Sequence, residues 1–434
     1  MSNEKSTIYF SSNAEVLAVA PALAERGSFL GNCISRMSPA LRHTDFKRLW
    51  VSSFLSNVGT WMQSLAQSWL VFQLTHSSFW LGAIAFAFSI PGLVLALVGG
   101  VVADHLNKRV ILIFTQSVMM VSAFILSALV FFKTITIHEI LLLAALSGIA
   151  NGINMPAYHS LIPSLVSRKE LTNAVALNSA QFHLSRVLGP ALGGFAIALL
   201  GVQGDFFLNG ISFLAPIIAL SRIHHVRDYE HQEGHFWSRL KDGFSYLFGH
   251  SELSSLLLLI MVGSLLALPY LLFIPYFARD VLHSNERGLG ALMACSGAGS
   301  LFGGATVAYL NIVKARGKFL FGAGLGFFSM IVLFCLSRSF ILSCALLVAA
   351  GYASVLMGAT ANAVVQHVVA DRVRGRVIGI YFTVVMGLPP IGGLLAGWLS
   401  RIFAVSHVIA VMAATALVGS AAIFASSRTL RQLH

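Results

Sequence analysis

The chain has 434 residues, of which 57% are hydrophobic and only 10% are charged, and its mean hydropathy is +0.81. This composition leaves too little polar surface to cover a soluble globule of that length, so it excludes an ordinary soluble domain and indicates a protein that uses lipid as its solvent. The formal net charge of +12 would suit a nucleic-acid-binding protein, but the positions of the basic residues point to membrane topology instead.

Apolar stretches long enough to cross a bilayer recur along the whole chain. A helix needs roughly 20 apolar residues to span about 30 Å of hydrocarbon, and about a dozen such stretches occur, separated by short polar turns. They are continuous and not alternating, which excludes a transmembrane β-barrel. The sequence predicts an all-α polytopic membrane protein with twelve transmembrane helices, at 48–72, 79–103, 109–132, 137–160, 174–200, 204–222, 252–278, 287–310, 319–337, 339–362, 377–400 and 404–425.

The basic residues are distributed unequally between the two sides of the predicted membrane. Of the 28 Lys and Arg residues, most lie in the tails, in the middle loop and in alternate turns. The positive-inside rule therefore places both termini and the middle loop in the cytoplasm, which requires an even number of crossings. The basic excess is a topology signal and a contact for lipid headgroups, so no nucleic-acid partner is predicted. The opposite turns carry only Lys133, Arg279, Arg287, Arg338 and Arg401.

The most polar stretch of the chain lies between the sixth and seventh spans and divides them into six and six. The halves echo each other, because Leu81-Gly82-Ala83 corresponds to Leu289-Gly290-Ala291 and Asn154 corresponds to Asn362 at the same offset. Such symmetry is typical of a duplicated transporter fold with a substrate site between pseudo-symmetric halves. The predicted organisation is an N-terminal cytoplasmic tail at 1–45, a first six-helix half at 46–222, a cytoplasmic middle loop at 223–251, a second six-helix half at 252–426 and a C-terminal tail at 427–434.

The turn after the second span carries Gly100, Asp104, Lys108 and Arg109. Gly100 allows two helices to approach closely, and Asp104 lies where a carboxylate can face the positive end of a neighbouring helix. A charge contact that breaks and re-forms can hold one of two conformations, because an unpaired buried carboxylate costs several kcal/mol. We therefore predict a conformational gate here; the alternative is a simple basic turn at the membrane edge.

This turn resembles the signature between the second and third helices of the major facilitator superfamily, although His105 and Asn107 stand where an arginine and a glycine are usual. Over about residues 41–425 the chain resembles, more narrowly, the drug–proton antiporter branch that holds enterobactin exporters and macrolide efflux pumps. The residues that carry this resemblance are Gly59-Thr60-Trp61-Met62-Gln63, Leu74-Thr75, Leu161-Ile162-Pro163 and Arg186-Val187-Leu188-Gly189-Pro190-Ala191-Leu192-Gly193-Gly194.

The fifth span combines a start signal with a glycine-rich face. Ser167 lies three residues before Glu170, a spacing that predicts a capped helix starting on the cytoplasmic surface. At 100° per residue, Asn178, Ser185, Gly189 and Gly193 share one stripe. Gly189, Pro190, Gly193 and Gly194 together resemble the antiporter motif of exporters in this superfamily, in which glycines permit close packing and the proline bends the helix.

Arg186 is the leading candidate for substrate contact. It lies about twelve residues into the fifth span, roughly 18 Å deep, where a charge is costly unless it meets water, a partner or a ligand. The alternative is a structural arginine satisfied by backbone carbonyls near Pro190. A polar stripe in the first span would suit a cavity for uncharged or zwitterionic groups, or else helix–helix packing. The predicted substrate-binding residues are Asn57, Gln63, Gln67, Asn154, Gln181, Arg186 and Asn362.

Proton coupling has no obvious carrier in the sequence. None of the 16 acidic residues lies in the middle of a predicted span, so the carboxylate that proton-coupled transporters usually titrate there is missing. His159 and His183 are the alternative proton carriers, although a lone histidine is more often structural. Histidines and a glutamate gather in the middle loop, but their spacing matches no closed zinc site. No metal and no cofactor are predicted.

The sequence favours transport over chemistry, because it contains no HExxH helix, no GxSxG turn and no phosphate loop. The resemblance implies a multi-pass protein of the bacterial inner membrane that exports drugs or siderophore-like molecules by alternating access with proton antiport. The expected partners are a small-molecule substrate, membrane lipids and protons, and a monomer is expected because twelve helices complete one transport unit. The alternatives are a lysophospholipid or lipid flippase, a facilitator without proton coupling, and a membrane-embedded enzyme or receptor.

Overall fold

The computed structural model describes residues 39–105, 107–223, 245–310, 316–370 and 373–427, and every regular element in these ranges is helical. The predicted spans all fall within these helices, with ends that differ by a few residues, so the predicted all-α membrane fold is confirmed. The elements are η1 (Pro39–Arg42), α2 (Thr44–Thr75), α3 (Ser78–His105), α4 (Lys108–Phe131), α5 (Ile137–Leu165), α6 (Leu171–Ser212), α7 (Leu214–Ser221), α9 (Ser251–Val262), η2 (Gly263–Ala267), η3 (Leu268–Phe273), α10 (Ile274–Tyr276), η4 (Phe277–Val281), α11 (Glu286–Leu310), α12 (Arg316–Leu336), α13 (Phe340–Val368), α14 (Arg374–Leu399) and α15 (Val405–Ser426).

Two details decide how many times the chain crosses. Ten helical stretches among the described residues are long and apolar enough to span a membrane, and one of them, Leu171–Ser221, has 51 residues. At Gly201 its backbone leaves the helical region, with φ 72° and ψ 175°, so this stretch consists of two helical arms and is long enough for two crossings. The 32-residue α2 is long enough to cross as well, but its polar residues keep it out of the apolar set. With both counted, the helices are compatible with the twelve predicted crossings.

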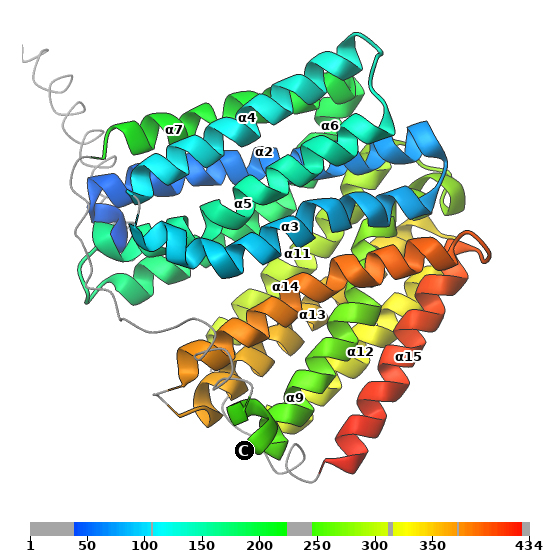
Figure 1. Cartoon of the computed structure of the whole chain (residues 1–434). Helices are drawn as coiled ribbons and strands as arrows, with labels where there is room; N and C mark the ends of the chain where they lie inside the picture. Colours follow the sequence, from blue (N-terminus) through cyan, green and yellow to red (C-terminus); the bar gives the residue numbers. More distant parts are fainter. Residues whose placement is uncertain (1–38, 106, 224–244, 311–315, 371–372, 428–434) are drawn as a thin grey trace, which may run out of the picture.

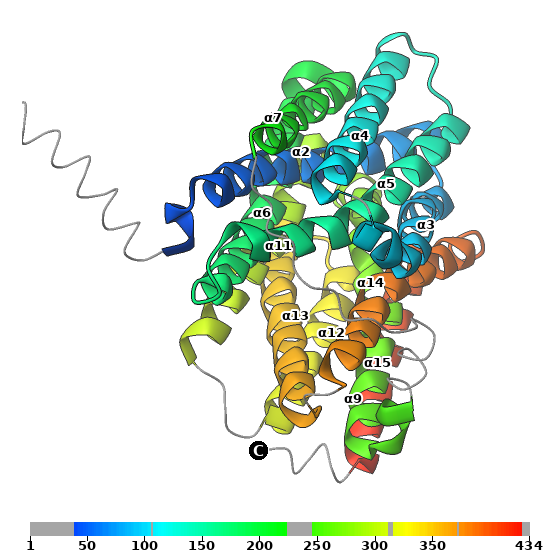
Figure 2. The ribbon, with the colours of Figure 1, turned by 60° about the vertical axis from the view of Figure 1, so that its left-hand side comes forward.

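The helices form two groups, α2 to α7 and α9 to α15 (Figure 1). Short turns connect the helices at one end of each group, and we call the end that they form, whose turns are given below, the hairpin face. The ends of the helices near 39–43, 166–170 and 427 define the terminal face. The two groups meet near the hairpin face and diverge towards the terminal face, and the view turned by 60° shows the same division (Figure 2). The turns of the hairpin face are 76–77, 132–136, 282–285, 337–339 and 400–404.

Two helix pairs join the halves, α3 with α14 and α6 with α11. Both contacts depend on glycine. A Cβ atom at Gly397 would lie 2.9 Å from Cα of Phe79, and one at Gly290 would lie 2.8 Å from the carbonyl oxygen of Pro190. Backbones this close leave no room for a side chain, as is usual where membrane helices pack tightly. The surface between the halves is thus built from backbone contacts that any larger residue would disturb.

The seventh span departs from regular α-helix. It begins as α9, winds as a π-helix over η2, tightens to a 3-10 helix over η3 and is π-helical again over η4. Pro269 and Pro275 lie in the irregular part, where each removes a backbone donor and blocks regular winding. The seventh span therefore stays helical but changes its winding around both prolines.

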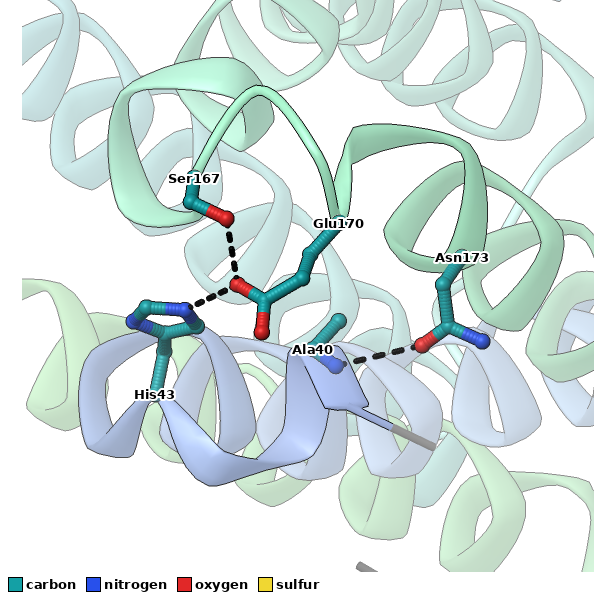
Figure 3. A network of polar contacts seen from close by, with 5 residues as sticks. All are labelled: Ala40, His43, Ser167, Glu170 and Asn173. Carbon is teal, nitrogen blue, oxygen red and sulfur yellow. Dashed lines mark hydrogen bonds and ion pairs between the residues drawn. The ribbon is translucent and has the colours of Figure 1, made fainter. Parts of the chain in front are cut away.

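At the terminal face a polar network ties the start of α2 to the turn before α6 (Figure 3). His43 Nε2 lies 2.6 Å from Glu170 Oε2, and the Ser167 hydroxyl donates to the same oxygen at 2.6 Å. The backbone N–H of Ala40 donates to Asn173 Oδ1 at 3.1 Å. The hydrogen bonds from Ser167 and His43, in that order of strength, hold the pKa of the Glu170 carboxyl below its usual range. The network joins elements of the first half only.

The predicted start of the fifth span needs a correction. Ser167 does not cap a helix, because residues 168–170 form a turn and α6 begins at Leu171. The Ser167–Glu170 pair does form, but it serves the network with His43. The capping box that the structure contains lies elsewhere, at the start of α5, where Thr136 and Glu139 satisfy each other's backbone groups.

Candidate transport site and gating contacts

The antiporter-like motif of α6 presents two faces to two different neighbours. Gly189 and Gly193 face α2, since a Cβ atom at Gly189 would lie 2.9 Å from the Val58 carbonyl oxygen. Pro190 and Gly194 face α11 of the other half, where a Cβ atom at Gly194 would lie 3.0 Å from Cα of Gly290. One short segment of α6 therefore packs against α2 inside the first half and against α11 at the surface between the halves.

Arg186 lies one turn before this motif and at the same surface between the halves. A Cβ atom at Gly297 of α11 would lie 2.9 Å from the Arg186 carbonyl oxygen. The guanidinium carbon lies 5.7 Å from the ring centroid of Trp61, within the range of a cation–π contact. Among the described residues no carboxylate forms an ion pair with Arg186 and no group accepts a hydrogen bond from it. The predicted structural role, with backbone carbonyls near Pro190 as acceptors, is therefore not what the structure shows.

The amides of the first span divide into one that is occupied and two that are free. Gln63 accepts a hydrogen bond of 2.7 Å from Asn209 Nδ2, which lies beyond the break in α6. Asn57 and Gln67 are half-buried and form no hydrogen bond within the described part of the chain. Asn57 shares one face of α2 with Trp61. The two free amides remain candidates for substrate contact, whereas Gln63 holds two spans together.

The other predicted substrate residues have separate surroundings. Asn154 is buried between α4 and α5, where its Oδ1 accepts a 3.1 Å hydrogen bond from Thr115. Asn362, its counterpart in the second half, accepts from Gln366 Nε2 at 3.2 Å. Gln181 is only 1% exposed, and neither atom of its amide has a partner among the described residues. The structure thus does not bring Asn154 and Asn362 together with Arg186.

The predicted gate is described only in part. At Gly100 and Asp104 the structure describes only the backbone, which is helical to the end of α3. Asn107 caps α4 by accepting a 3.0 Å hydrogen bond from the Arg109 backbone N–H. The Arg109 guanidinium donates to the Ser221 carbonyl oxygen at the end of α7, where a helix presents the negative end of its dipole. Arg109 therefore anchors a helix of its own half, and Lys108 is half-buried beside it.

The two predicted proton carriers, His159 and His183, lie in different surroundings. The structure also contains a buried carboxylate, Asp205, that was not singled out from the sequence. His159 is exposed, and the buried Nδ1 atom of His183 has no partner among the described residues. Asp205 is fully buried, and within the described ranges neither carboxylate oxygen has a hydrogen-bond partner. Sequence reasoning missed Asp205 because it lies at the very start of the predicted span 204–222, where contact with water was expected.

Aromatic and basic side chains close the hairpin face between the halves. The Phe72 ring lies 6.2 Å from that of Tyr276, and the Arg401 guanidinium carbon lies 4.0 Å from the centroid of Phe79. A cavity of about 220 Å³ lies beside these contacts and is lined from both halves, by residues that include His76 and Phe403. The hairpin face is thus closed by side chains, while the helices separate towards the terminal face.

The structure can be searched for a metal site only in part of the chain. The histidines of the middle loop, His224, His225, His231 and His235, and Glu233 lie outside the described residues. In the part of the chain that the structure describes, no three His, Cys, Asp or Glu side chains gather as metal ligands would.

The sequence matches a known protein family over most of its length. The profile of the family described as transmembrane secretion effector, a major facilitator family, matches residues 34–433. The chain belongs to this family. The predicted superfamily and branch are therefore confirmed, and the chain is a multi-pass transporter of the bacterial inner-membrane type.

The transporter has relatives with named activities along most of its length. The staphyloferrin A transporter of Staphylococcus aureus is 24% identical over 378 residues, covering 84% of this chain and 92% of the relative. The multidrug efflux pump Tap of Mycolicibacterium fortuitum is 24% identical over 359 residues, covering 80% and 87%. The enterobactin exporter EntS of Escherichia coli is 23% identical over 358 residues, covering 82% and 85%.

Solved structures confirm the fold alone. The nucleoside transporter NupG superposes with a TM-score of 0.68 at 14% identity, over 88% of this transporter and 98% of that chain. A POT family transporter superposes with a TM-score of 0.71 at 11% identity, over 89% and 96%.

Proposed function

We propose that this transporter exports small amphiphilic organic molecules that carry an anionic group. The observation that carries the proposal is Arg186, a guanidinium deep in a membrane helix, at the contact between the halves and without a carboxylate partner among the described residues. A charge at that depth is costly unless it meets water, a partner or a ligand. A carboxylate or phenolate on the substrate would supply the missing opposite charge.

The surroundings of Arg186 suit the apolar part of such a molecule. Trp61 lies against the guanidinium, and the ring of Phe182 lies 6.0 Å from that of Trp61 in an edge-on arrangement. The free amides of Asn57 and Gln67 on α2 add neutral hydrogen-bonding groups. Aromatic surface with a few polar groups is what sites for small organic ligands usually present.

Charge and shape together support an assignment of the state that the structure represents. The distribution of basic residues favours a cytoplasmic terminal face, and the halves meet at the opposite, hairpin face. The structure would then represent the inward-facing state of an alternating-access cycle, ready to take substrate from the cytoplasm. The relatives named as exporters of enterobactin and staphyloferrin A and as a multidrug efflux pump support export, and proton antiport would drive it.

The test is export from cells that lack their own siderophore and drug exporters. Cells producing the intact transporter should export enterobactin, staphyloferrin A or anionic dyes faster than empty-vector cells. Arg186→Gln should raise KM for the anionic compounds about tenfold, equivalent to about 1.4 kcal/mol, and Arg186→Lys should retain part of the affinity. Arg338→Gln is the matched control, because Arg338 is an exposed arginine in a turn of the hairpin face.

Two results would overturn the proposal. One is equal efflux from cells with and without the transporter for every anionic compound. The other is uptake of labelled lysophospholipid by proteoliposomes that is fast and unaffected by Arg186→Gln, which would favour a lipid flippase.

A further inference from the structure

Asp205 is a carboxylate without a partner in the interior of the first half. Its relative exposure is 0%, and neither oxygen has a hydrogen-bond partner among the described residues. It lies one turn beyond the break at Gly201, roughly 6 Å along the helix axis from the hairpin face. The transport proposal for Arg186 does not use this group.

The neighbours of Asp205 come from three segments. A Cβ atom at Gly193, on the first part of α6, would lie 3.4 Å from Asp205 Oδ1 and 3.1 Å from Cα of Met62 on α2. One turn further along, Asn209 donates one amide N–H to Gln63, and Asp205 accepts no hydrogen bond from the second N–H. Asp205 therefore faces backbone and apolar side chains.

No charged group in the described part of the chain compensates Asp205. The segments of α2 from Leu49 to Thr75 and of α4 from Val110 to Phe131 contain no acidic, basic or histidine residue, and neither does α7. None of the charged or titratable groups on the elements packed against α6 forms an ion pair or a hydrogen bond with Asp205. These groups are His183 and Arg186 of α6 itself, Arg42 of η1, Asp45, Lys47 and Arg48 of α2, Lys108 and Arg109 of α4, His138, Glu139, Tyr158 and His159 of α5, and Glu286, Arg287 and Cys295 of α11.

Such a carboxyl group has two low-cost states. It can bind a proton and become neutral, or it can stay ionised where a rearrangement gives it water or a donor. The rearrangement has to move one of the three segments around it, because the site is fully buried as it stands.

The residue in contact with Asp205 belongs to the motif that joins the halves. Gly193 faces Asp205, and the next residue, Gly194, faces Gly290 of α11 at backbone distance. A shift of this part of α6 that opened the Asp205 site would therefore also change the α6–α11 contact. That contact must loosen on the hairpin face when an alternating-access transporter opens outwards.

We propose that Asp205 is the proton-binding site that couples protons to opening of the hairpin face. In the outward-facing state the carboxylate takes one proton from the hairpin side, which converts COO⁻ to COOH and leaves a neutral group that can be buried. The neutral group stays buried while the transporter is inward-facing as in this structure. Its proton leaves towards the terminal face once a shift of one of the three surrounding segments admits water to the carboxyl group, and no other bond changes. The coupling to export rests on the proposed function, whereas proton binding at Asp205 does not.

Infrared spectroscopy of the unmutated transporter tests proton binding directly. In protein labelled with ¹³C at the aspartate side chains, a pH titration in lipid should show the C=O stretch of a protonated carboxyl group, shifted by the isotope. The band that reports Asp205 is the one that persists above about pH 6, where ordinary aspartates are ionised, and this band should be lost in Asp205→Asn. Absence of an isotope-sensitive band at every pH, or its persistence in Asp205→Asn, would overturn the proposal, and the first of these outcomes needs no mutant that folds.

The coupling is tested by a distance across the hairpin face. Spin labels at His76→Cys and Phe403→Cys, which line one cavity from opposite halves, report opening after Cys33, Cys295, Cys335 and Cys344 are replaced by Ser. The mean label distance should change between about pH 5 and pH 8, and Asp205→Asn should abolish this change. Glu139→Gln is the control, because it removes a carboxylate at the same face while glutamine can still cap α5.

The outcomes separate this inference from the proposed function. A pH-dependent distance that survives Asp205→Asn sinks the coupling role, even if export of anionic compounds is confirmed. Downhill export that persists in Asp205→Asn, together with loss of proton movement, supports both proposals. Absence of export with an Asp205-dependent distance change would leave the proton site standing and remove only the proposed substrate class.

Discussion

Arg186 and Asp205 are two ionisable side chains on the two arms of α6, and they serve opposite surfaces. Arg186 lies at the contact with α11 against Trp61, whereas Asp205 faces Gly193 inside the first half. No described interaction joins them. If they formed an ion pair, neither charge would be available, so their separation is what the two proposed roles require, the cation for an anionic substrate and the carboxylate for a proton.

The hydrogen bond between Thr115 and Asn154 holds α4 to α5 and is expected to be structural. Asn154→Ala should lower the free energy of unfolding by about 1–3 kcal/mol, because a buried polar pair loses one partner. Thermal unfolding in detergent measures this loss, and KM for exported compounds should stay unchanged. A raised KM without loss of stability would instead return Asn154 to the substrate site.

The Glu170 network should give stability that depends on pH in a defined direction. Because the pKa of Glu170 is lowered in the folded protein, its contribution is present above the unfolded pKa near 4.5 and is lost as the pH falls through the folded value. Glu170→Gln should therefore lower Tm at neutral pH, and the difference from the unmutated transporter should shrink below about pH 4. A difference that grows on acidification would contradict this assignment.

Individual residues were the hardest to predict from the sequence. Arg186 was identified because a charge inside an apolar run is conspicuous. Asp205 was missed because the sequence does not show that the chain turns within a few residues at Gly201 and buries the next helical turn. The pairing of Gln63 with Asn209 was equally hidden, since it depends on how two distant spans are packed.

At the scale of helices, α6 is both a scaffold and a contact between the halves. Its glycines face α2 on one side and α11 on the other, so its position is fixed by backbone contacts. The sequence predicted the glycine-rich face of this span, because periodicity is a local property, whereas the predicted cap at its start was wrong. For the seventh span the sequence predicted only a helix at 252–278, and the π and 3-10 winding of η2, η3 and η4 was not predicted, since the register of such turns depends on neighbouring helices.

The contact between α6 and α11 should be sensitive to one methyl group. In Gly290→Ala the new Cβ atom would lie 2.8 Å from the Pro190 carbonyl oxygen, and overpacking of this kind costs about 1–3 kcal/mol. Because the penalty applies while the hairpin face is closed, the labels at His76 and Phe403 should report a population shift of about tenfold or more towards the open state.

Gly304→Ala is the matched control on the same helix. Nothing lies within 4 Å of a Cβ atom at Gly304, so the label distances should stay as in the unmutated transporter. Equal shifts in both variants would mean that helix propensity, and not the contact with α6, caused the change.

For the whole molecule, the decisive feature is that the halves meet at one face and separate towards the other. Alternating access requires the closed face to open in turn. A bifunctional maleimide joining Phe72→Cys to Tyr276→Cys, whose native rings lie 6.2 Å apart, should therefore abolish export in a background without the native cysteines. Transport assays before and after reduction of a cleavable linker measure the effect.

A link inside one half provides the comparison. His43→Cys and Glu170→Cys replace a 2.6 Å contact between elements of the first half, so joining them should leave most of the export rate. Loss of export with this link as well would mean that the halves do not move as units, contrary to the proposed cycle.

The polar character of α2 also affects how the chain is made. Its length suffices to cross a bilayer, yet it is less apolar than the ten described stretches that are apolar enough to span a membrane. A segment with so many hydroxyl and amide groups partitions poorly from the translocon into lipid by itself. Gln63 of α2 accepts a hydrogen bond from Asn209, which lies 146 residues later in the chain. The first helix to leave the ribosome therefore gains its stable place in the bilayer only when helices that have yet to be synthesised arrive beside it.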